Sequence, residues 1–497
     1  MAHSRVLQSG PRVRMLYSRC WRNMIDFPTR RDLIKLTSAG LAAMAQAAPV
    51  RAQNAAAPAG EIEVRVTAGA KRYAQEPSLE WRPETGSSID SVVIDPDTTF
   101  QEMLGFGAAL TDAACYMFHE LPTGAREQLF RDLFSPSETG LSVCRICVGS
   151  SDYATSAYSF DEGAPDPELT RFSIDHDRAY ILPMLKQARS ANPDLFLLAS
   201  PWSPPGWMKA NGSMLGGSMR KHSFPVYAEY LARFLGGYAE AGVAVNALSV
   251  QNEVDTDQDG RMPACLWGQE YEIEFVSKHL GPLLERRQIP TKIWILDHNY
   301  NLWGRAICEL DEPGMKRYVD GVAWHGYAGK PDAMTHVHDV HPDMHTYWTE
   351  GGPDIDDPKY QTDWANWGAS FAGILHNWAR CIIGWNMALD ERGKPNIGPF
   401  SCGGVVTIDS KTKEITRSGQ YWAFVHYARS IQRGAKRMES SAMLKGVSHV
   451  AFANPGGSKA VVLTNTGDER QVLLRMSGRQ AAATLPQDSI VTLTWRS

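Results

Sequence analysis

Residues 245–253 read Val245-Asn-Ala-Leu-Ser-Val-Gln-Asn-Glu253, a short apolar run that ends on a glutamate. Residues 345–352 repeat the pattern as His345-Thr-Tyr-Trp-Thr-Glu350-Gly-Gly. A run of four to eight largely apolar residues, bounded by turn-forming residues, is typical of a fully buried strand. Each run therefore predicts a strand of a buried parallel sheet with a carboxylate at its C-terminal end.

Six further apolar runs bring the total to eight, and amphipathic helical patterns separate them. The runs are Met103–Leu110, Ser142–Gly149, Leu195–Ser200, Val245–Asn252, Thr291–Asp297, Val319–His325, His345–Glu350 and Cys381–Met387. The helical patterns include Gly124–Phe134, Asp177–Ala191, Pro225–Glu240, Tyr271–Arg287 and Asp363–Arg380. Eight strand–helix units are what a (β/α)8 TIM barrel requires, so an α/β fold of that kind is predicted.

Strand patterns also flank the barrel region on both sides. They are Glu61–Thr67 and Ser91–Ile94 before it, and Val447–Phe452, Ala460–Thr464, Gln471–Leu474 and Ile490–Thr494 after it. Strands from the two ends can pair, which predicts an appended β-sandwich domain. The expected domains are a linker at 53–60, N-terminal sandwich strands at 61–100, the barrel at 101–435 and C-terminal sandwich strands at 436–497.

The first 52 residues differ in charge from the rest of the chain. They hold nine Lys or Arg and two Asp, a charge of +7, so the remainder carries −12 of the total of −5. Thr29-Arg-Arg-Asp-Leu-Ile-Lys35 resembles a twin-arginine signal, followed by an Ala-rich apolar stretch and the small-residue pattern Val50-Arg-Ala52. A periplasmic or secreted protein is expected, with Met24 as a plausible start.

Several classes of partner and covalent chemistry are not expected. The acidic remainder argues against nucleic acid or an anionic membrane as the main partner. No integral membrane segment is expected after removal of the leader, because no other run is long and apolar enough. Of the eight cysteines, the seven that follow the leader are irregularly spaced and imply no disulfide framework. Cys144 and Cys147 point to opposite faces of one predicted strand. The oligomeric state stays open.

The predicted strand ends carry a set of polar and aromatic residues. In a TIM barrel the active site lies at the C-terminal ends of the strands. Those positions hold Asp112, Asp152, Trp202, Asn252, Glu253, His298, His325, Tyr327, Glu350 and Trp385. Two glutamates with hydroxyl-binding groups and aromatic platforms are what a glycosidase needs, although rim glutamates can also simply form salt bridges. Glu253 is expected to be the acid/base, with a pKa raised toward neutrality by burial and by the charge of the nucleophile Glu350.

Cofactor and metal patterns are weak, and none is expected to be used. Asp255–Gly260 mimics the start of a calcium loop, but its twelfth position is Leu266 rather than Glu. His336, His338, His341 and His345 match no zinc spacing. Gly105-Phe-Gly107 lacks the third glycine of a dinucleotide loop. A metal-dependent barrel hydrolase that uses the four histidines, and a non-catalytic sugar-binding protein, remain the alternative hypotheses.

A series of longer motifs resembles glycoside hydrolase family 30, the glucosylceramidase family. The motifs occur in order over about residues 95–435. They are Gln101-Glu-Met-Leu-Gly-Phe-Gly-Ala-Ala-Leu-Thr-Asp112, Ser200-Pro-Trp-Ser-Pro-Pro-Gly-Trp-Met-Lys209 with Asn211-Gly212, Gln251-Asn-Glu253, Thr349-Glu-Gly-Gly352, Gly384-Trp-Asn-Met-Ala-Leu389 and Tyr421-Trp-Ala-Phe-Val-His-Tyr427. The family consists of retaining β-glycosidases with a barrel and a β-sandwich side domain.

The resemblance implies roles for individual residues. It implies Glu253 as acid/base and Glu350 as nucleophile, with their carboxyl groups about 5 Å apart as retention requires. It also implies a first sugar subsite formed by Asp152, Trp202, Asn252 and Trp385, with His325 and Tyr327 at the end of strand six.

Two departures from the family pattern bear on the substrate. Asn252-Glu253-Val254 stands where Asn-Glu-Pro is frequent, and His325-Gly326-Tyr327 stands where glucosylceramidases have His-Trp-Tyr. Gly326 replaces an aromatic side chain and so changes the shape of the part of the active site that binds the leaving group. Ceramide is therefore less expected as the leaving group. The expected substrate is a β-glucoside or β-glucan, with β-1,6-glucanase, β-xylosidase or β-fucosidase specificity as alternatives.

Overall fold

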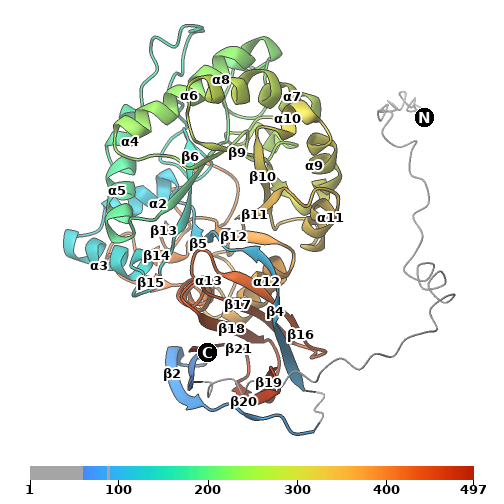
Figure 1. Cartoon of the computed structure of the whole chain (residues 1–497). Coiled ribbons are helices and arrows are strands. Elements are labelled where there is room, and N and C mark those ends of the chain that lie inside the picture. Colours follow the sequence, from blue (N-terminus) through green and yellow to red (C-terminus); the bar gives the residue numbers. More distant parts are fainter. Residues whose placement is uncertain (1–59, 87–89, 497) are drawn as a thin grey trace, which may run out of the picture. The chain divides into compact units, whose positions relative to one another are not determined.

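A computed structural model describes residues 60–86 and 90–496 of the chain (Figure 1). The twin-arginine segment, Met24 and nearly all of the expected linker lie outside these residues. The described residues fall within one compact unit. Among them, no helix combines the length and the apolar character that crossing a bilayer demands.

Eight parallel strands form the predicted barrel. They are β5 (Gly105–Ala108), β6 (Val143–Val148), β7 (Phe196–Pro201), β8 (Ala247–Ser249), β9 (Lys292–Asn299), β10 (Val319–His325), β11 (His345–Glu350) and β12 (Ala379–Gly384). Their order is β5-β12-β11-β10-β9-β8-β7-β6. An isolated parallel bridge between Ala109 and Arg145 links the two ends of this order, as does a 2.7 Å hydrogen bond from the Leu110 N–H to the Arg145 carbonyl. Each apolar run thus forms a strand, and the predicted fold class is confirmed.

Helices surround the barrel because each turns one apolar stripe toward the strands. In α5 (Ile181–Ala191) the buried residues are Ile181, Leu182, Met184, Leu185 and Ala188, which share one face. The other helices are α2 (Asp112–His119), α3 (Thr123–Phe134), α4 (Asp175–Arg178), α6 (Phe224–Glu240), α7 (Gln269–Glu274), α8 (Gly281–Arg286), α9 (Trp303–Leu310), α10 (Pro313–Lys316), α11 (Asp332–Val340), α12 (Trp364–His376) and α13 (Gly419–Ala428). Each of the five predicted helical patterns contains a helix, but Asp177–Ala191 is divided between α4 and α5, and Asp363–Arg380 extends past the end of α12 into β12. A π-helical turn at Phe275–Leu280 joins α7 to α8.

The sandwich is built from both ends of the described chain. Its strands are β1 (Ile62–Ala68), β2 (Lys71–Leu79), β3 (Arg82–Pro83), β4 (Ser91–Glu102), β16 (Lys436–Ser441), β17 (Val447–Ala453), β18 (Ser458–Asn465), β19 (Arg470–Met476), β20 (Arg479–Leu485) and β21 (Ser489–Arg496). β4 pairs with β19 at its start and with β16 along its length. The sequence patterns did not predict β2, β3, β16 and β20, or the small sheet of β13 (Ala388–Leu389), β14 (Val406–Ile408) and β15 (Ile415–Arg417).

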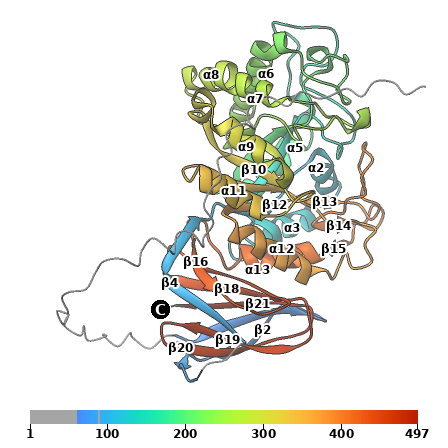
Figure 2. The same ribbon diagram turned by 90° about the vertical axis from the view of Figure 1, so that its right-hand side faces the viewer.

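Helices α12 and α13 lie between the barrel strands and the sandwich (Figure 2). His426 of α13 is fully buried there. Its ring nitrogens lie 2.7 Å from the Thr492 hydroxyl of β21 and 2.8 Å from the Thr67 hydroxyl of β1. Burial lowers the pKa of His426 to about 3, so the ring is neutral and joins the two domains by hydrogen bonds alone.

The seam of the barrel generates a stability prediction. A Cβ atom on Gly107 of β5 would lie 1.6 Å from the Val143 carbonyl oxygen of β6, a backbone atom that can retreat only by opening the seam. Gly107→Ala is expected to cost more than about 3 kcal/mol of unfolding free energy, measured by urea denaturation, or to prevent soluble expression. The control is Gly124→Ala in α3, where a Cβ meets nothing within 4 Å. Equal stability of the two variants would contradict the close packing of β5 on β6.

Candidate active site

A cavity of about 450 Å³ opens at the C-terminal ends of the barrel strands. Seven of the eight site residues implied by the resemblance line it, and the eighth, His325, is fully buried and contacts Glu253. The complete lining is Asp152, Trp202, Asn252, Glu253, Thr256, Gln258, Met262, His298, Asn299, Tyr327, Glu350, Trp385, Phe400 and Cys402.

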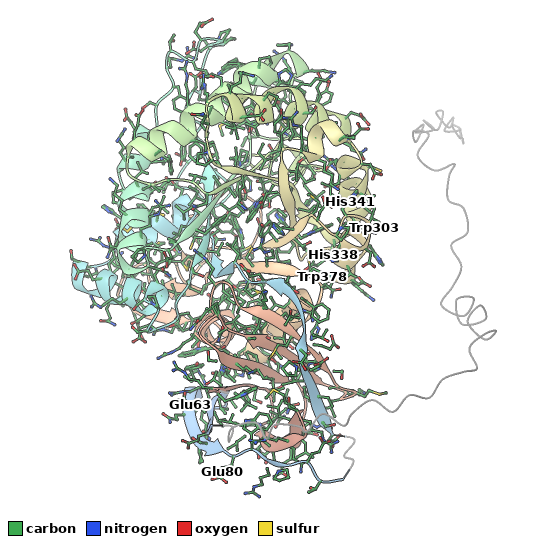
Figure 3. All side chains as sticks on the ribbon, in the orientation of Figure 1. Glu63, Glu80, Trp303, His338, His341 and Trp378 are labelled. Atoms are coloured by element: carbon green, nitrogen blue, oxygen red, sulfur yellow. The ribbon has the colours of Figure 1, made fainter. Side chains whose placement is uncertain are left out.

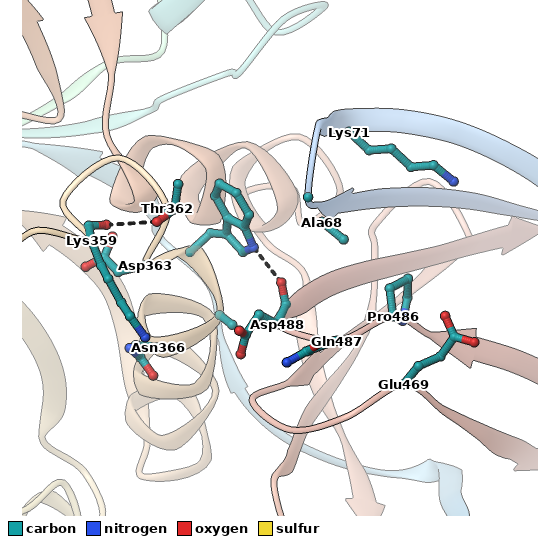
Figure 4. Close-up of a pocket in the computed structure, with 13 residues that line it drawn as sticks. Ala68, Lys71, Lys359, Thr362, Asp363, Asn366, Glu469, Pro486, Gln487 and Asp488 are labelled. Carbon is teal, nitrogen blue, oxygen red and sulfur yellow. Dashed lines mark hydrogen bonds between the residues drawn. The ribbon is translucent and has the colours of Figure 1, made fainter.

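A larger cavity of about 700 Å³ lies elsewhere, where the β1–β2 turn and the 486–488 loop meet the start of α12 (Figure 4). There the Trp364 indole N–H donates to the Asp488 carbonyl at 2.7 Å. Burial raises the pKa of Asp363 in this cavity to about 7. The predicted site residues are absent from its lining, so size alone does not identify the functional cavity.

Glu350, the last residue of β11, is fixed from two sides. The Arg145 guanidinium of β6 donates to its Oε2, and the Tyr327 hydroxyl donates to its Oε1 at 3.1 Å. Arg145 is fully buried and also donates to Asn252 Oδ1 at 2.6 Å and to Asp297 Oδ2 at 2.7 Å. Burial alone would lower the pKa of Arg145, but the charges of Asp297 and Glu350 raise it above its ordinary value. The carboxylate of Glu350 therefore has a permanent cation beside it.

The carboxylate of Asp297 in β9 holds the Arg145 guanidinium in place. Its carboxylate accepts hydrogen bonds from the hydroxyls of Ser200, Ser249 and Thr349 at 2.6–2.8 Å, besides the bond from Arg145. Burial raises the pKa of Asp297, but the Arg145 charge and His325 outweigh it and hold that pKa well below its usual range. A fully buried aspartate therefore stays ionised.

Glu253 follows β8 with a φ of 55°. Its carboxylate accepts a hydrogen bond from the Gln258 amide at 2.7 Å, and the other oxygen lies 3.7 Å from Nδ1 of His325. Burial raises the pKa of Glu253, but His325 and His298 outweigh burial, so the pKa lies below its ordinary value. The expectation of a pKa raised toward neutrality is therefore wrong for the substrate-free protein.

The reason is the position of His325 between carboxylates. Its Nε2 lies 3.1 Å from Asp297 Oδ1 and 3.9 Å from Glu350 Oε2. Burial lowers the pKa of His325, yet the negative charges of Glu350 and its neighbours raise it to about 9. An imidazolium therefore supplies Glu253 with a positive charge that its position in the sequence does not reveal.

One wall of the cavity is aromatic and carries an acid. Trp202 and Trp385 stack with ring centroids 5.1 Å apart, and the Arg145 guanidinium lies 4.7 Å above Trp202. Asp152 is buried, and burial together with the charges of Glu350 and Glu253 raises its pKa well above the ordinary value. A protonated Asp152 can donate a hydrogen bond to a ligand hydroxyl beside the aromatic platform.

Other sequence candidates lie away from this chemistry. Asp112 is buried and accepts 2.7 Å hydrogen bonds from the Thr155 N–H and the Tyr180 hydroxyl, outside the cavity lining. In the calcium-like segment, Asp255 pairs with His298 at 2.5 Å, which makes that segment an acidic rim loop. Cys115, Cys144, Cys147, Cys265 and Cys381 are buried thiols within the described part of the chain.

The four histidines between residues 336 and 345 do not converge on a common point. Figure 3 labels two of them, His338 and His341. His338 stacks on Trp378 with centroids 3.5 Å apart, His341 faces Asp311, and His336 lies beside Trp303. Among residues 60–86 and 90–496, the one group whose ligand atoms converge is Glu253, His298 and His325. A metal hydrolase built on the 336–345 cluster is therefore wrong.

Two contributors escaped sequence reasoning. Arg145 lies inside a buried strand rather than at its end, and a charge within the apolar run Ser142–Gly149 was the available signal. Gln258 lies in the loop interpreted only as a failed calcium motif. Neither residue lies at the C-terminal end of a barrel strand. Arg145 bonds to strand-end residues from within β6, and Gln258 does so from a loop.

Known proteins resemble the chain over both domains. The glycosyl hydrolase family 30 TIM-barrel domain matches residues 103–431, and the family 30 β-sandwich domain matches residues 434–493. An endo-1,6-β-D-glucanase of Neurospora crassa is 30% identical over 393 residues, 76% of this chain and 79% of that protein. The lysosomal acid glucosylceramidase of Mus musculus is 26% identical over 438 residues, 83% of this chain and 84% of that protein.

The fold of solved structures agrees with this assignment. SrfJ from Salmonella typhimurium superposes with a TM-score of 0.85 at 25% identity, over 88% of this chain and all of that chain. An endo-β-1,6-glucanase gives a TM-score of 0.80 at 24% identity with the same coverage. The chain therefore belongs to glycosyl hydrolase family 30 and is a glycosidase.

Proposed function

We propose that the chain hydrolyses β-glucosidic bonds by double displacement, with Glu350 as nucleophile and Glu253 as acid/base. The carboxylate of Glu350 attacks the anomeric carbon while Glu253 gives its proton to the departing oxygen. Glu253 then takes a proton from water, whose oxygen displaces Glu350 and releases the sugar with its original β configuration. The observation that carries the proposal is one cavity in which both glutamates meet, each held by different partners.

The partners decide which glutamate has which role. A nucleophile must be ionised throughout, and Glu350 lies against Arg145, a guanidinium that stays charged at any working pH. An acid/base must gain and lose a proton, and Glu253 bonds directly to an amide, while its nearest cation, the imidazolium of His325, lies 3.7 Å away rather than in direct contact. Asp152, Trp202, Asn252 and Trp385 form the first sugar subsite in this proposal.

The surroundings of Glu253 indicate the chemistry of the leaving group. The proton donor faces the departing oxygen, and the polar side chains of Thr256, Gln258, His298 and Asn299 line the cavity with it. A Cβ on Gly326 would lie 2.9 Å from the Trp348 ring, so the end of β10 has no room for a side chain there. A hydroxyl-bearing leaving group fits this rim better than an acyl chain.

We therefore propose a β-1,6-linked glucan as the substrate. The saccharide-type rim supports it, as does similarity to fungal proteins named endo-1,6-β-glucanases. Tyr327 and Phe400, half exposed in the cavity lining, offer faces for further sugar rings. Glucosylceramide, the substrate named for the Mus musculus relative, would link the chain to sphingolipid metabolism and is the competing outcome.

We further propose that residues 1–52 act as a twin-arginine-type signal, which would direct the enzyme to the periplasm or the exterior. The Arg30-Arg31 pair and the Ala-rich stretch after it support this proposal. A polymeric glucan is met outside the cytoplasm, so location and substrate agree.

The assignment of the nucleophile can be tested by trapping. A 2-deoxy-2-fluoro-β-glucoside with a good leaving group is expected to label Glu350, located by peptide mass spectrometry. Glu350→Gln should retain less than about 1% of kcat, because the attacking carboxylate is lost.

Glu253→Gln should lose far less activity than Glu350→Gln on a dinitrophenyl glucoside, because dinitrophenolate departs without protonation. Glu127→Gln on exposed helix α3 is the control, and a label on any other residue would overturn the assignment.

The charge on His325 predicts a pH shift. His325→Gln keeps a hydrogen-bond donor for Asp297 but removes a positive charge that lies 3.7 Å from Glu253 and 3.9 Å from Glu350. The pKa of Glu253 should rise, so the basic limb of the kcat/KM profile, which requires a protonated Glu253, should move to higher pH by about one unit. The exposed control His336→Gln should leave the profile in place. A profile that is unmoved, or that shifts to lower pH, would exclude control of Glu253 by His325.

Substrate choice is tested with β-1,6- and β-1,3-linked gluco-oligosaccharides of equal length and glucosylceramide in mixed micelles. The β-1,6-linked series is expected to give a kcat/KM at least about tenfold above the other two, because the polar rim binds sugar hydroxyls. Proton NMR should detect the β anomer first. Faster cleavage of glucosylceramide would reject the saccharide leaving group, and an α anomer as first product would reject double displacement.

A further inference from the structure

Glu253, His298 and His325 bring one ligand atom each within 4.8 Å of one another. His298 and His325 are 6% and 0% exposed, and Glu253 lines the cavity with His298. The proposed hydrolysis uses Glu253 as a proton carrier and His325 as a charge beside it. It assigns no step to His298, so the convergence of two imidazoles on Glu253 is not required by the reaction.

Both imidazoles are oriented as in metal proteins. Metal-binding histidines typically donate one ring N–H to a carboxylate, which leaves the other nitrogen free as a ligand. His325 places Nε2 3.1 Å from Asp297 Oδ1, and His298 places Nε2 2.5 Å from Asp255 Oδ1. The Nδ1 atom of each ring is buried and has no hydrogen-bond partner, and a metal ion would displace the proton that the imidazolium of His325 carries there.

The spacing is close to what a small cation needs. His325 Nδ1 lies 3.7 Å from Glu253 Oε1. Two ligands of a tetrahedral zinc ion, each about 2.0–2.2 Å from the metal, lie roughly 3.4 Å apart. Side-chain adjustments of about an ångström would complete a site with two nitrogens and one carboxylate. Its fourth position would be open to water or a sugar hydroxyl from the cavity.

We propose that Glu253, His298 and His325 bind a divalent transition metal, Zn²⁺ in the first instance, and that its binding reversibly inhibits the glycosidase. Imidazole ligands select zinc, copper or nickel over the hard cations magnesium and calcium. The positive charge of a metal ion on Glu253 opposes protonation of its carboxylate, and the ion lies where the departing oxygen must approach the acid. Binding follows from the side chains alone, whereas inhibition rests on the proposed role of Glu253.

Binding is tested by titrating the metal-stripped full chain with ZnCl₂ in a calorimeter and with CoCl₂ in a spectrophotometer. One equivalent of Zn²⁺ is expected to bind, and Co²⁺ is expected to give the visible absorption of a four-coordinate site. His298→Ala should weaken Zn²⁺ binding at least tenfold, and Glu253→Gln should also weaken it. Asp255→Asn, which disturbs only the orientation of His298, should weaken binding less and remains informative if His298→Ala does not fold. His336→Ala, on the exposed face of α11, is the matched control and should bind as the parent does.

Inhibition is measured on each variant relative to its own metal-free rate. A zinc inhibition constant raised at least tenfold in His298→Ala, and unchanged in His336→Ala, supports the proposal. Equal inhibition constants in parent and His298→Ala would overturn it, as would zinc binding that only His336→Ala removes. If no glucoside is turned over, the calorimetric and cobalt measurements still decide whether the site exists, so failure of the proposed function is distinguishable.

Discussion

The buried guanidinium of Arg145 is the interaction on which the active site depends. It extends from β6 and bonds to Glu350 at the end of β11, Asp297 in β9 and Asn252 beyond β8, while its Nε donates to Ser200 of β7 at 2.9 Å. A charge removed from water is costly unless it is fully paired, and here every contact is to a fixed oxygen on a barrel strand or its end. The closed barrel therefore positions the partners of Arg145, and Arg145 in turn positions the carboxylate of Glu350 in the cavity.

The balance of charge around Arg145 explains the protonation of its neighbours. Arg145 and the imidazolium of His325 supply two positive charges beneath the cavity, and Asp297, Glu253 and Glu350 supply three carboxylates. A fourth carboxylate in the same buried volume has no cation left, and Asp152 correspondingly has a raised pKa. With Glu253 ionised, as in the substrate-free protein, these groups carry one net negative charge, and the proton that Glu253 must take up before hydrolysis brings them to neutrality.

The sequence predicted the parts of this molecule that obey a simple periodicity. Barrel strands are buried on both faces, so they read as apolar runs, and their C-terminal ends gave most of the cavity lining. β2 escaped prediction because Lys71-Arg-Tyr-Ala-Gln-Glu-Pro-Ser-Leu79 is largely polar and partly exposed, and β20 because its inward residues are mainly alanines. The 336–345 histidines, which offered only an alternative hypothesis, form no site because α11, the loop after it and the start of β11 direct them to different neighbours. The lowered pKa of Glu253 depends on His325, which only the closed barrel brings near it.

The pairing of β1 with β21 has a consequence for how the chain reaches this structure. Ile490 and Thr494 lie opposite Thr67 and Glu63, so the first and last described strands are neighbours in one sheet. During synthesis β1 can pair with β2 as soon as both have emerged, but β21, its partner on the other side, exists only after the entire barrel has been made. The β1–β21 pairing thus joins residues far apart in the sequence, and pairings of that kind slow folding. Until β21 pairs with it, β1 presents an open edge, the kind of surface that chaperones shield from aggregation.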